Sequence, residues 1–139
     1  MILISHRGNL NGPNPKTENC PTQILKVLEM GFDCEVDVWR EQGKFYLGHD
    51  DPNYSVDQAF LSKPNLWIHA KNLEALTNMP NGVNFFWHET DSYTLTSKGY
   101  IWTFPNKTTS GKSVIVDKSR NWRSKNYNCF GVCTDYILN

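Results

Sequence analysis

The sequence predicts an α/β fold, a reduced (β/α)8 barrel of the TIM type in which several helices are shortened or missing. Eight short apolar runs follow one another along the chain, separated by short helical segments or by loops alone. Several of these runs end in histidine, glutamate or aspartate, as strands of a parallel barrel do where their carboxyl ends open into a site. The chain has 139 residues, whereas the usual barrel needs at least ~200. Parts of the sheet would therefore be exposed or covered by another subunit.

The composition predicts one domain that spans residues 1–139. Apolar residues make up 39% of the chain and aromatic residues 13%, which argues against disorder. Fourteen basic residues balance 14 acidic ones, which argues against a general nucleic-acid binder but allows a local cationic pocket for one phosphate. No apolar run reaches the ~18 residues of a membrane span, and no signal peptide is recognisable. A cytoplasmic protein is therefore expected.

The first third of the chain predicts a strand–helix–strand unit. Residues 2–5 form an apolar strand, and residues 32–39 form a second one. Between them lies a helix that ends at Gly31 and whose apolar face has the i, i+3, i+4 spacing of Ile24, Leu25, Val27 and Leu28. This unit should be a right-handed parallel crossover. Residues 44–48 follow so closely that they indicate either a local hairpin or an irregular barrel.

The remaining segments continue the alternation less regularly. Helices are expected at 54–62 and 73–79, with a helical turn at 92–97. Residues 120–128 form a polar loop without a helical face. The other apolar runs predict strands at 66–70, 83–88, 100–104, 114–117 and 130–136.

Side chains two apart on a strand face the same side, so alternation predicts which residues point inward. Four sets of residues each share one side of a strand: Ile2, Ile4 and His6; Glu35, Asp37 and Trp39; Phe45, Leu47 and His49; and Trp67, His69 and Lys71. If every set points into the barrel, the polar residues of the four sets meet at one end of the barrel. On the strand at 83–88 the pocket is lined either by Trp87 and Glu89 or by Phe86 and His88.

Glu35 and Asp37 are the candidate metal ligands. Two buried carboxylates on one side of a strand repel each other, and a divalent cation that accepts oxygen ligands from both removes the conflict. The alternative is a pair of solvent-facing acids on an exposed edge. His69 is a candidate third ligand, but a substrate contact or a structural role stays open. An imidazole ligand suits zinc, manganese or iron better than calcium.

Two further pairs have the residue types of acid–base chemistry and of anion binding. His6 and His49 are the candidate catalytic acid and base, in either order, because imidazole exchanges protons near neutral pH. Arg7 and Lys71 are candidates to bind the phosphate. Glu18 and Asn19 either orient Arg7 or a metal-bound water, or cap the following helix. Asp117 and Asp135 end strands and are candidates to hold Arg7 or Lys71.

Four segments together resemble the glycerophosphodiester phosphodiesterase family. They read His6-Arg7-Gly8, Thr17-Glu18-Asn19-Cys20, Glu35-Val36-Asp37 and His49-Asp50, and Gly131–Tyr136 echoes a segment near that family's last strand. The resemblance implies one divalent metal ion on the Glu-x-Asp pair, Mg²⁺ or Ca²⁺ first, with Mn²⁺ or Zn²⁺ as alternatives. It also implies acid–base roles for the two motif histidines. Where the family has Glu-x-Lys on its fourth strand, this chain has His69-Ala70-Lys71.

The expected function is that of an enzyme, a metal-dependent phosphoric diester hydrolase. It would cleave a glycerophosphodiester-like small molecule to an alcohol and a phosphomonoester. The alternatives are a lyase that gives a cyclic phosphate, a zinc hydrolase acting on another ester, and a non-catalytic module that binds a phosphate or sugar phosphate. Neither a nucleic-acid partner nor a membrane span is expected, and a homo-oligomer is left open.

Overall fold

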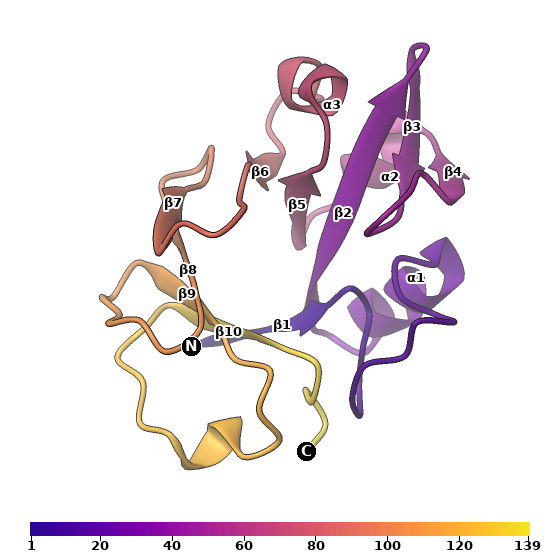
Figure 1. Cartoon of the computed structure of the whole chain (residues 1–139). Coiled ribbons are helices and arrows are strands. Elements are labelled where there is room, and N and C mark those ends of the chain that lie inside the picture. Colours follow the sequence, from indigo (N-terminus) through magenta and orange to yellow (C-terminus); the bar gives the residue numbers. More distant parts are fainter.

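A long strand, β2 (Asp33–Glu41), lies at the centre of the sheet (Figure 1). The computed structural model describes residues 1–139. The first part of β2 pairs in parallel with β1 (Ile2–His6) and with β5 (Leu66–Ala70). Its last part pairs antiparallel with β3 (Lys44–Leu47). The strand–helix–strand unit and the tight hairpin that follows it are both present.

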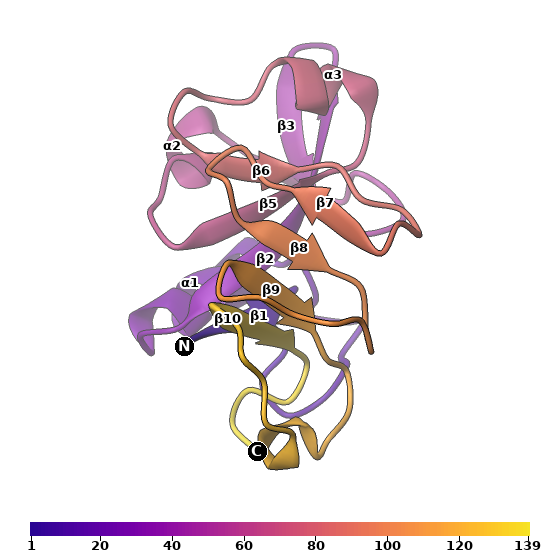
Figure 2. The same ribbon diagram turned by 90° about the vertical axis from the view of Figure 1, so that its left-hand side faces the viewer.

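The sheet curls into an open half-barrel of mixed strand direction. Figure 2 shows its strands stacked one above another. Antiparallel hairpins add β4 (Tyr54–Val56) to β3 and β7 (Tyr93–Leu95) to β8. The parallel strands run in the order β6 (Asn84–Phe86), β5, β2, β1, β10 (Gly131–Thr134), β9 (Ser113–Val116) and β8 (Ile101–Thr103).

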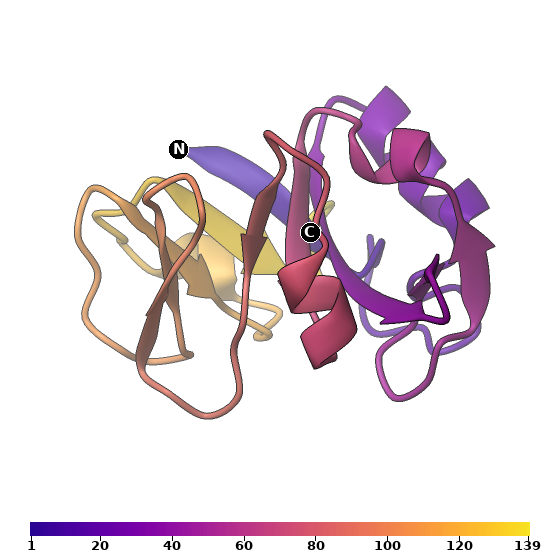
Figure 3. The same ribbon diagram turned by 90° about the horizontal axis from the view of Figure 1, so that it is seen from above.

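The predicted (β/α)8 class is wrong. The chain has only three short α-helices, α1 (Pro21–Glu29), α2 (Gln58–Leu61) and α3 (Leu73–Thr77), and all of them precede β6. The segments between β8, β9 and β10 carry only a single 3-10 turn, Trp122–Ser124. These connections are polar and have no apolar repeat at helical spacing, so they could not bury a helix face against the sheet. In Figure 3 the orange-to-yellow third of the chain lies beside the rest and contains no α-helix.

Two local predictions also fail, and in both cases strand pairing replaces a helix. Residues 54–62 were expected to be one helix, but Tyr54–Val56 pairs with β3 and the helix begins only after Asp57, whose carboxylate accepts from the Phe60 N–H at 2.8 Å. Residues 92–97 were expected to form a helical turn, but β7 pairs there with β8. The β-branched and aromatic residues of both segments suit a strand once a partner is available. The eight expected strands are present, with ends shifted by a few residues.

Apolar residues pack on both faces of the curled sheet. Outside, β2 and β5 pack against the helices through residues such as Val36, Ile68 and Val27. Inside, the cluster contains Ile4, Trp67, Phe86, Trp102, Val116 and Cys133. The inner face therefore follows the alternation expected for β1, β2 and β5, and it lines the site described next. No helix has the length and apolar character needed to cross a membrane.

Candidate metal centre

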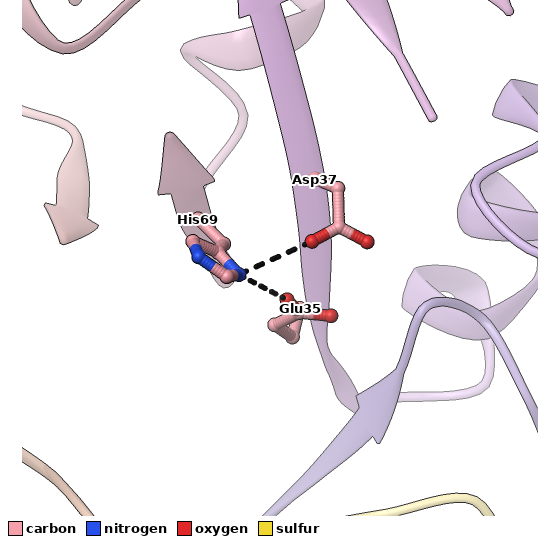
Figure 4. A group of neighbouring side chains, drawn as sticks. All are labelled: Glu35, Asp37 and His69. Carbon is pink, nitrogen blue, oxygen red and sulfur yellow. Dashed lines mark ion pairs between the residues drawn. The ribbon is translucent and has the colours of Figure 1, made fainter. Parts of the chain in front are cut away.

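Three side chains from two neighbouring strands converge inside the half-barrel (Figure 4). Glu35 and Asp37 lie two apart on β2, and His69 on β5 is the register partner of Asp37. The His69 Nδ1 atom lies 3.2 Å from Asp37 Oδ1 and 3.8 Å from Glu35 Oε2. One potential ligand atom from each residue lies within 4.8 Å of the others. Both carboxylates are buried, at 2% and 0% exposure, so water screens them little.

The hydrogen bonding of His69 favours a cation between these groups. Its Nε2 atom lies 2.9 Å from the carbonyl oxygen of His88, which can only accept, so Nε2 carries the ring hydrogen. The other nitrogen, Nδ1, therefore faces two carboxylates, either as a donor or, when a metal ion is bound, through its lone pair. Glu35 Oε1 and Asp37 Oδ1 are buried without a hydrogen-bond partner. Metal-ligating histidines typically donate their other N–H to a carbonyl in this way. The group could therefore hold a metal ion.

The two carboxylates differ in their electrostatic surroundings. Burial and the neighbouring charge of Asp37 raise the pKa of Glu35 well above its usual range, against the attraction of Arg7 and Lys71. Burial would also raise the pKa of Asp37, but His69, Arg7 and Asn19 outweigh it and lower that pKa. Of the two carboxylates, Glu35 therefore binds a proton more readily than Asp37 does.

Asp37 is held from the chain segment that precedes α1. The Asn19 side chain donates to Asp37 Oδ2 at 2.9 Å and accepts from the Asp37 N–H at 2.9 Å. Arg7 has a positive φ of 58°, which turns its side chain back toward the site. Its Nε atom lies 3.4 Å from Asp37 Oδ2, and its Nη1 atom lies 3.3 Å from Glu18 Oε1. Of the roles left open, Glu18 orients Arg7. Asn19 has a role that was not expected, because it orients Asp37, a candidate metal ligand.

His6 points into the half-barrel from the end of β1. Its Nδ1 atom lies 2.7 Å from Asp135 Oδ1, and the parallel pairing of β1 with β10 brings the two residues together. The Asn9 amide donates to the same Asp135 oxygen at 2.8 Å and to Glu18 Oε2 at 2.9 Å. Burial would raise the pKa of Asp135, but His6 and Asn9 lower it. Asp135 therefore holds His6, and not Arg7 or Lys71 as expected.

His49 reaches the site by a different route from the one predicted. Phe45 and Leu47 pack in the outer cluster, so strand alternation does not place His49 inside. The chain turns at Gly48, where a Cβ atom would lie 1.8 Å from the carbonyl oxygen of Asp51. The Gly48 N–H donates to the Asp37 carbonyl at 3.1 Å, which fixes the loop to β2. The His49 ring is 40% exposed, and its Nδ1 atom lies 2.8 Å from Asp50 Oδ1.

A cavity of about 340 Å³ connects these groups. Six of the seven predicted site residues line it, namely His6, Arg7, Glu35, His49, His69 and Lys71. The seventh, Asp37, lies behind them and is fully buried. Trp102 and Phe104 form an apolar part of the wall.

Three residues of this region were missed or left undecided by sequence reasoning. His88 lines the cavity, which decides the open choice on β6 in favour of the face of Phe86 and His88, although Glu89 also contributes to the wall. Lys118 lines it as well, and alternation through Val114 and Val116 could have identified it. Asn9 could not have been identified, because its contacts depend on how the loop after β1 folds back.

Comparison with family models, curated proteins and solved structures found no match.

Proposed function

We propose that this protein is a metal-dependent phosphodiesterase that cleaves a glycerophosphodiester-like substrate to an alcohol and a phosphomonoester. The observation that carries the proposal is the buried triad of Glu35, Asp37 and His69 beside a cavity with three further histidines, His6, His49 and His88, at its wall. Arg7, Lys71 and Lys118 border the same cavity, so a phosphate there would be surrounded by cations. A protein that bound only metal would have no need of this arrangement.

Glu35, Asp37 and His69 would hold one divalent cation, Mg²⁺ or Ca²⁺, with Mn²⁺ or Zn²⁺ as alternatives that the imidazole ligand favours. When bound, the ion would polarise the phosphoryl oxygen and offset the charge that develops on it. Arg7 is positioned to bind a second phosphate oxygen, because Glu18 and Asp37 hold its guanidinium at the cavity wall. Lys71 would neutralise the remaining charge from the end of β5.

His6 is the better-placed base. Its contact with the Asp135 carboxylate requires a hydrogen on Nδ1, which leaves the lone pair of Nε2 free to accept a proton from the attacking oxygen. His49 lies at the more open side of the cavity, where the departing alcohol can leave toward solvent. His49 would donate the proton that the leaving oxygen needs. Attack by water would give a monoester, and attack by a neighbouring substrate hydroxyl would give a cyclic phosphate.

The activity can be tested by phosphorus NMR on a panel of glycerophosphodiesters and lysophospholipids, each with Mg²⁺, Ca²⁺, Mn²⁺ or Zn²⁺ and with or without chelator. We expect chelator-sensitive cleavage that is abolished in His6→Ala and in Glu35→Gln. Glu41→Gln is the matched control, because Glu41 is an exposed acid at the far end of the same strand. Cleavage that survives both site substitutions would contradict the proposal, and the product would distinguish a hydrolase from a lyase.

Metal binding is measured separately by calorimetry with Mn²⁺. Changes around metal ligands cost about 10- to 100-fold in affinity, so loss of a ligand in Asp37→Asn should weaken binding by about 100-fold or more. Unchanged affinity in Asp37→Asn and Glu35→Gln would remove the metal site from the proposal. Tight metal binding with no cleavage of any substrate would instead favour the non-catalytic binding module.

A further inference from the structure

A second cavity, of about 490 Å³, opens at the opposite end of the strands from the metal centre. It is lined by residues at or before the beginnings of the strands, among them Ile2, Asp33, Leu66 and Asn84. The metal cavity is lined by residues near the strand ends, so the two openings face opposite ways. The volume lies within the range of about 300 to 1,000 Å³ that is common for small-molecule sites.

Three aromatic rings form one wall of this second cavity. The ring centroids of Tyr100 and Phe130 lie 4.5 Å apart, and those of Trp67 and Tyr100 lie 5.1 Å apart. Trp67 also packs against Trp102 at 6.0 Å, and Trp102 lines the metal cavity. The two indoles thus separate the cavities. Tyr100 and Phe130 are half-buried, which leaves ring surface on which a planar ligand can stack.

Two hydrogen-bond acceptors without partners belong to residues that line the same cavity. Asn84 is only 9% exposed, and its Oδ1 atom is buried without a partner. Asp33 accepts from the Trp67 N–H at 2.9 Å through Oδ2, while its Oδ1 takes part in no hydrogen bond. A buried acceptor without a donor is rare in folded proteins. A ligand that fits here should therefore bring N–H or O–H donors.

Two lysine side chains lie at the opening of the second cavity. Lys63 and Lys98 both line the cavity and are exposed, and neither takes part in an ion pair. Lysine is a common phosphate binder. The second cavity thus has an aromatic wall on which a ring can stack, hydrogen-bond acceptors near its inner end, and two lysines at its opening.

We infer that this cavity is a second binding site, for a nucleoside monophosphate or a molecule of the same chemistry. The base stacks on Tyr100 and Phe130, and its N–H groups donate to Asn84 and Asp33. The phosphate lies at the opening between Lys63 and Lys98. The site takes no part in the proposed cleavage reaction.

The test is calorimetric titration of chelator-treated protein with AMP, GMP, CMP and UMP, and with adenosine and inorganic phosphate as partial ligands. We expect at least one nucleotide to bind about tenfold or more tightly than adenosine or phosphate, as one hydrogen bond to a charged group provides. The exposed pair Lys63→Ala with Lys98→Ala should weaken nucleotide binding about tenfold and leave adenosine unchanged. Asn84→Leu should weaken both ligands, with circular dichroism to confirm folding.

Lys71→Ala is the matched control, because Lys71 belongs to the metal cavity. If nucleotides bind in the second cavity, their affinity should be the same in Lys71→Ala as in the unaltered protein. Weakening by Lys71→Ala without weakening by the Lys63/Lys98 pair would move the ligand to the metal cavity and overturn the inference. Absence of binding by all four nucleotides at millimolar concentration would overturn it as well.

Discussion

The imidazole of His6 is held by a carboxylate that lies 129 residues away in the chain. Asp135 also accepts from Asn9, Asn9 donates to Glu18, and Glu18 binds Arg7. This series of contacts joins the candidate base to the candidate phosphate ligand. A substitution of any residue in this series should therefore alter the positions of both His6 and Arg7, even when the substituted residue does not touch the substrate.

The substitution Asp135→Asn tests whether the contact between Asp135 and His6 matters for catalysis. An amide at this position could hydrogen-bond His6 through either its oxygen or its nitrogen, so it no longer requires the hydrogen to be on Nδ1. Turnover should fall by about 100-fold or more, while KM and Mn²⁺ affinity stay within a factor of about two. The measurements are steady-state kinetics and calorimetry. Unchanged turnover, or an equal loss of metal affinity, would mean that Asp135 has only a structural role.

The single residues also show why the site could be predicted only in part. Glu35, Asp37 and His69 were predicted because alternation along a strand has a fixed period and needs no knowledge of the fold. His49 was predicted to line the site for the wrong reason, since the turn at Gly48 and not alternation brings it there. The contact between His6 and Asp135 depends on the pairing of the first strand with the last, which no local pattern reveals.

At the scale of elements, the loop after β3 carries His49 and depends on one glycine. Gly48→Ala should cost about 2 to 4 kcal/mol in the free energy of unfolding, because the added Cβ meets backbone and not a flexible side chain. The displaced loop should also lower turnover through His49. Gly43→Ala is the control: Gly43 has a φ of 78° but open space around it, so only backbone strain of about 1 kcal/mol is added. Equal losses in urea denaturation would show that the close contact does not matter.

The loop between β9 and β10 gives a prediction for pH. Burial would raise the pKa of Asp117, but hydrogen bonds from Lys125, Ser119 and Tyr127 lower it to about 2. A lowered carboxyl pKa contributes stability above the unfolded value near 4, and this contribution is lost as the pH falls toward 2. Because solvent screens part of these interactions, Asp117→Asn should be about 1 kcal/mol less stable at pH 7.

Below pH 4 the difference between the two proteins should shrink. Urea denaturation at pH 7, 5, 4 and 3 measures it. A difference that stays constant over this range would assign the loss to altered packing and not to the charge of Asp117.

For the whole molecule, eight of the ten strands could be predicted, and their arrangement could not. Apolar runs mark those eight strands, whereas β4 and β7 lie in segments that were expected to be helical. Whether a connection becomes a helix or a hairpin strand depends on the neighbour it meets, as β4 and β7 show. The outer edge of β7 is left open, with Leu95 69% exposed. Association into a homo-oligomer stays open.

The opening of the half-barrel is bridged at Ser97. Its N–H donates to the Phe85 carbonyl at 2.8 Å, and its hydroxyl both accepts from the Phe85 N–H at 2.9 Å and donates to the Val83 carbonyl at 3.0 Å. These bonds tie the β7–β8 hairpin to the segment of β6. Ser97→Ala removes the two hydroxyl bonds and should cost about 1 to 3 kcal/mol in the free energy of unfolding.

Because the lost bonds join the β7–β8 hairpin to the segment of β6, the loss of stability should extend over both of these parts of the sheet. Hydrogen exchange should become faster in both β6 and the β7–β8 hairpin, and slowly exchanging amides of β1 and β2 should stay protected. Ser62→Ala is the matched control, because the Ser62 hydroxyl donates at 2.9 Å only to Gln58 within α2. It should cost no more than about 0.5 kcal/mol. If the two variants are equally stable, the hydroxyl of Ser97 does not stabilise the half-barrel. In that case β6 and the β7–β8 hairpin do not depend on each other for their stability.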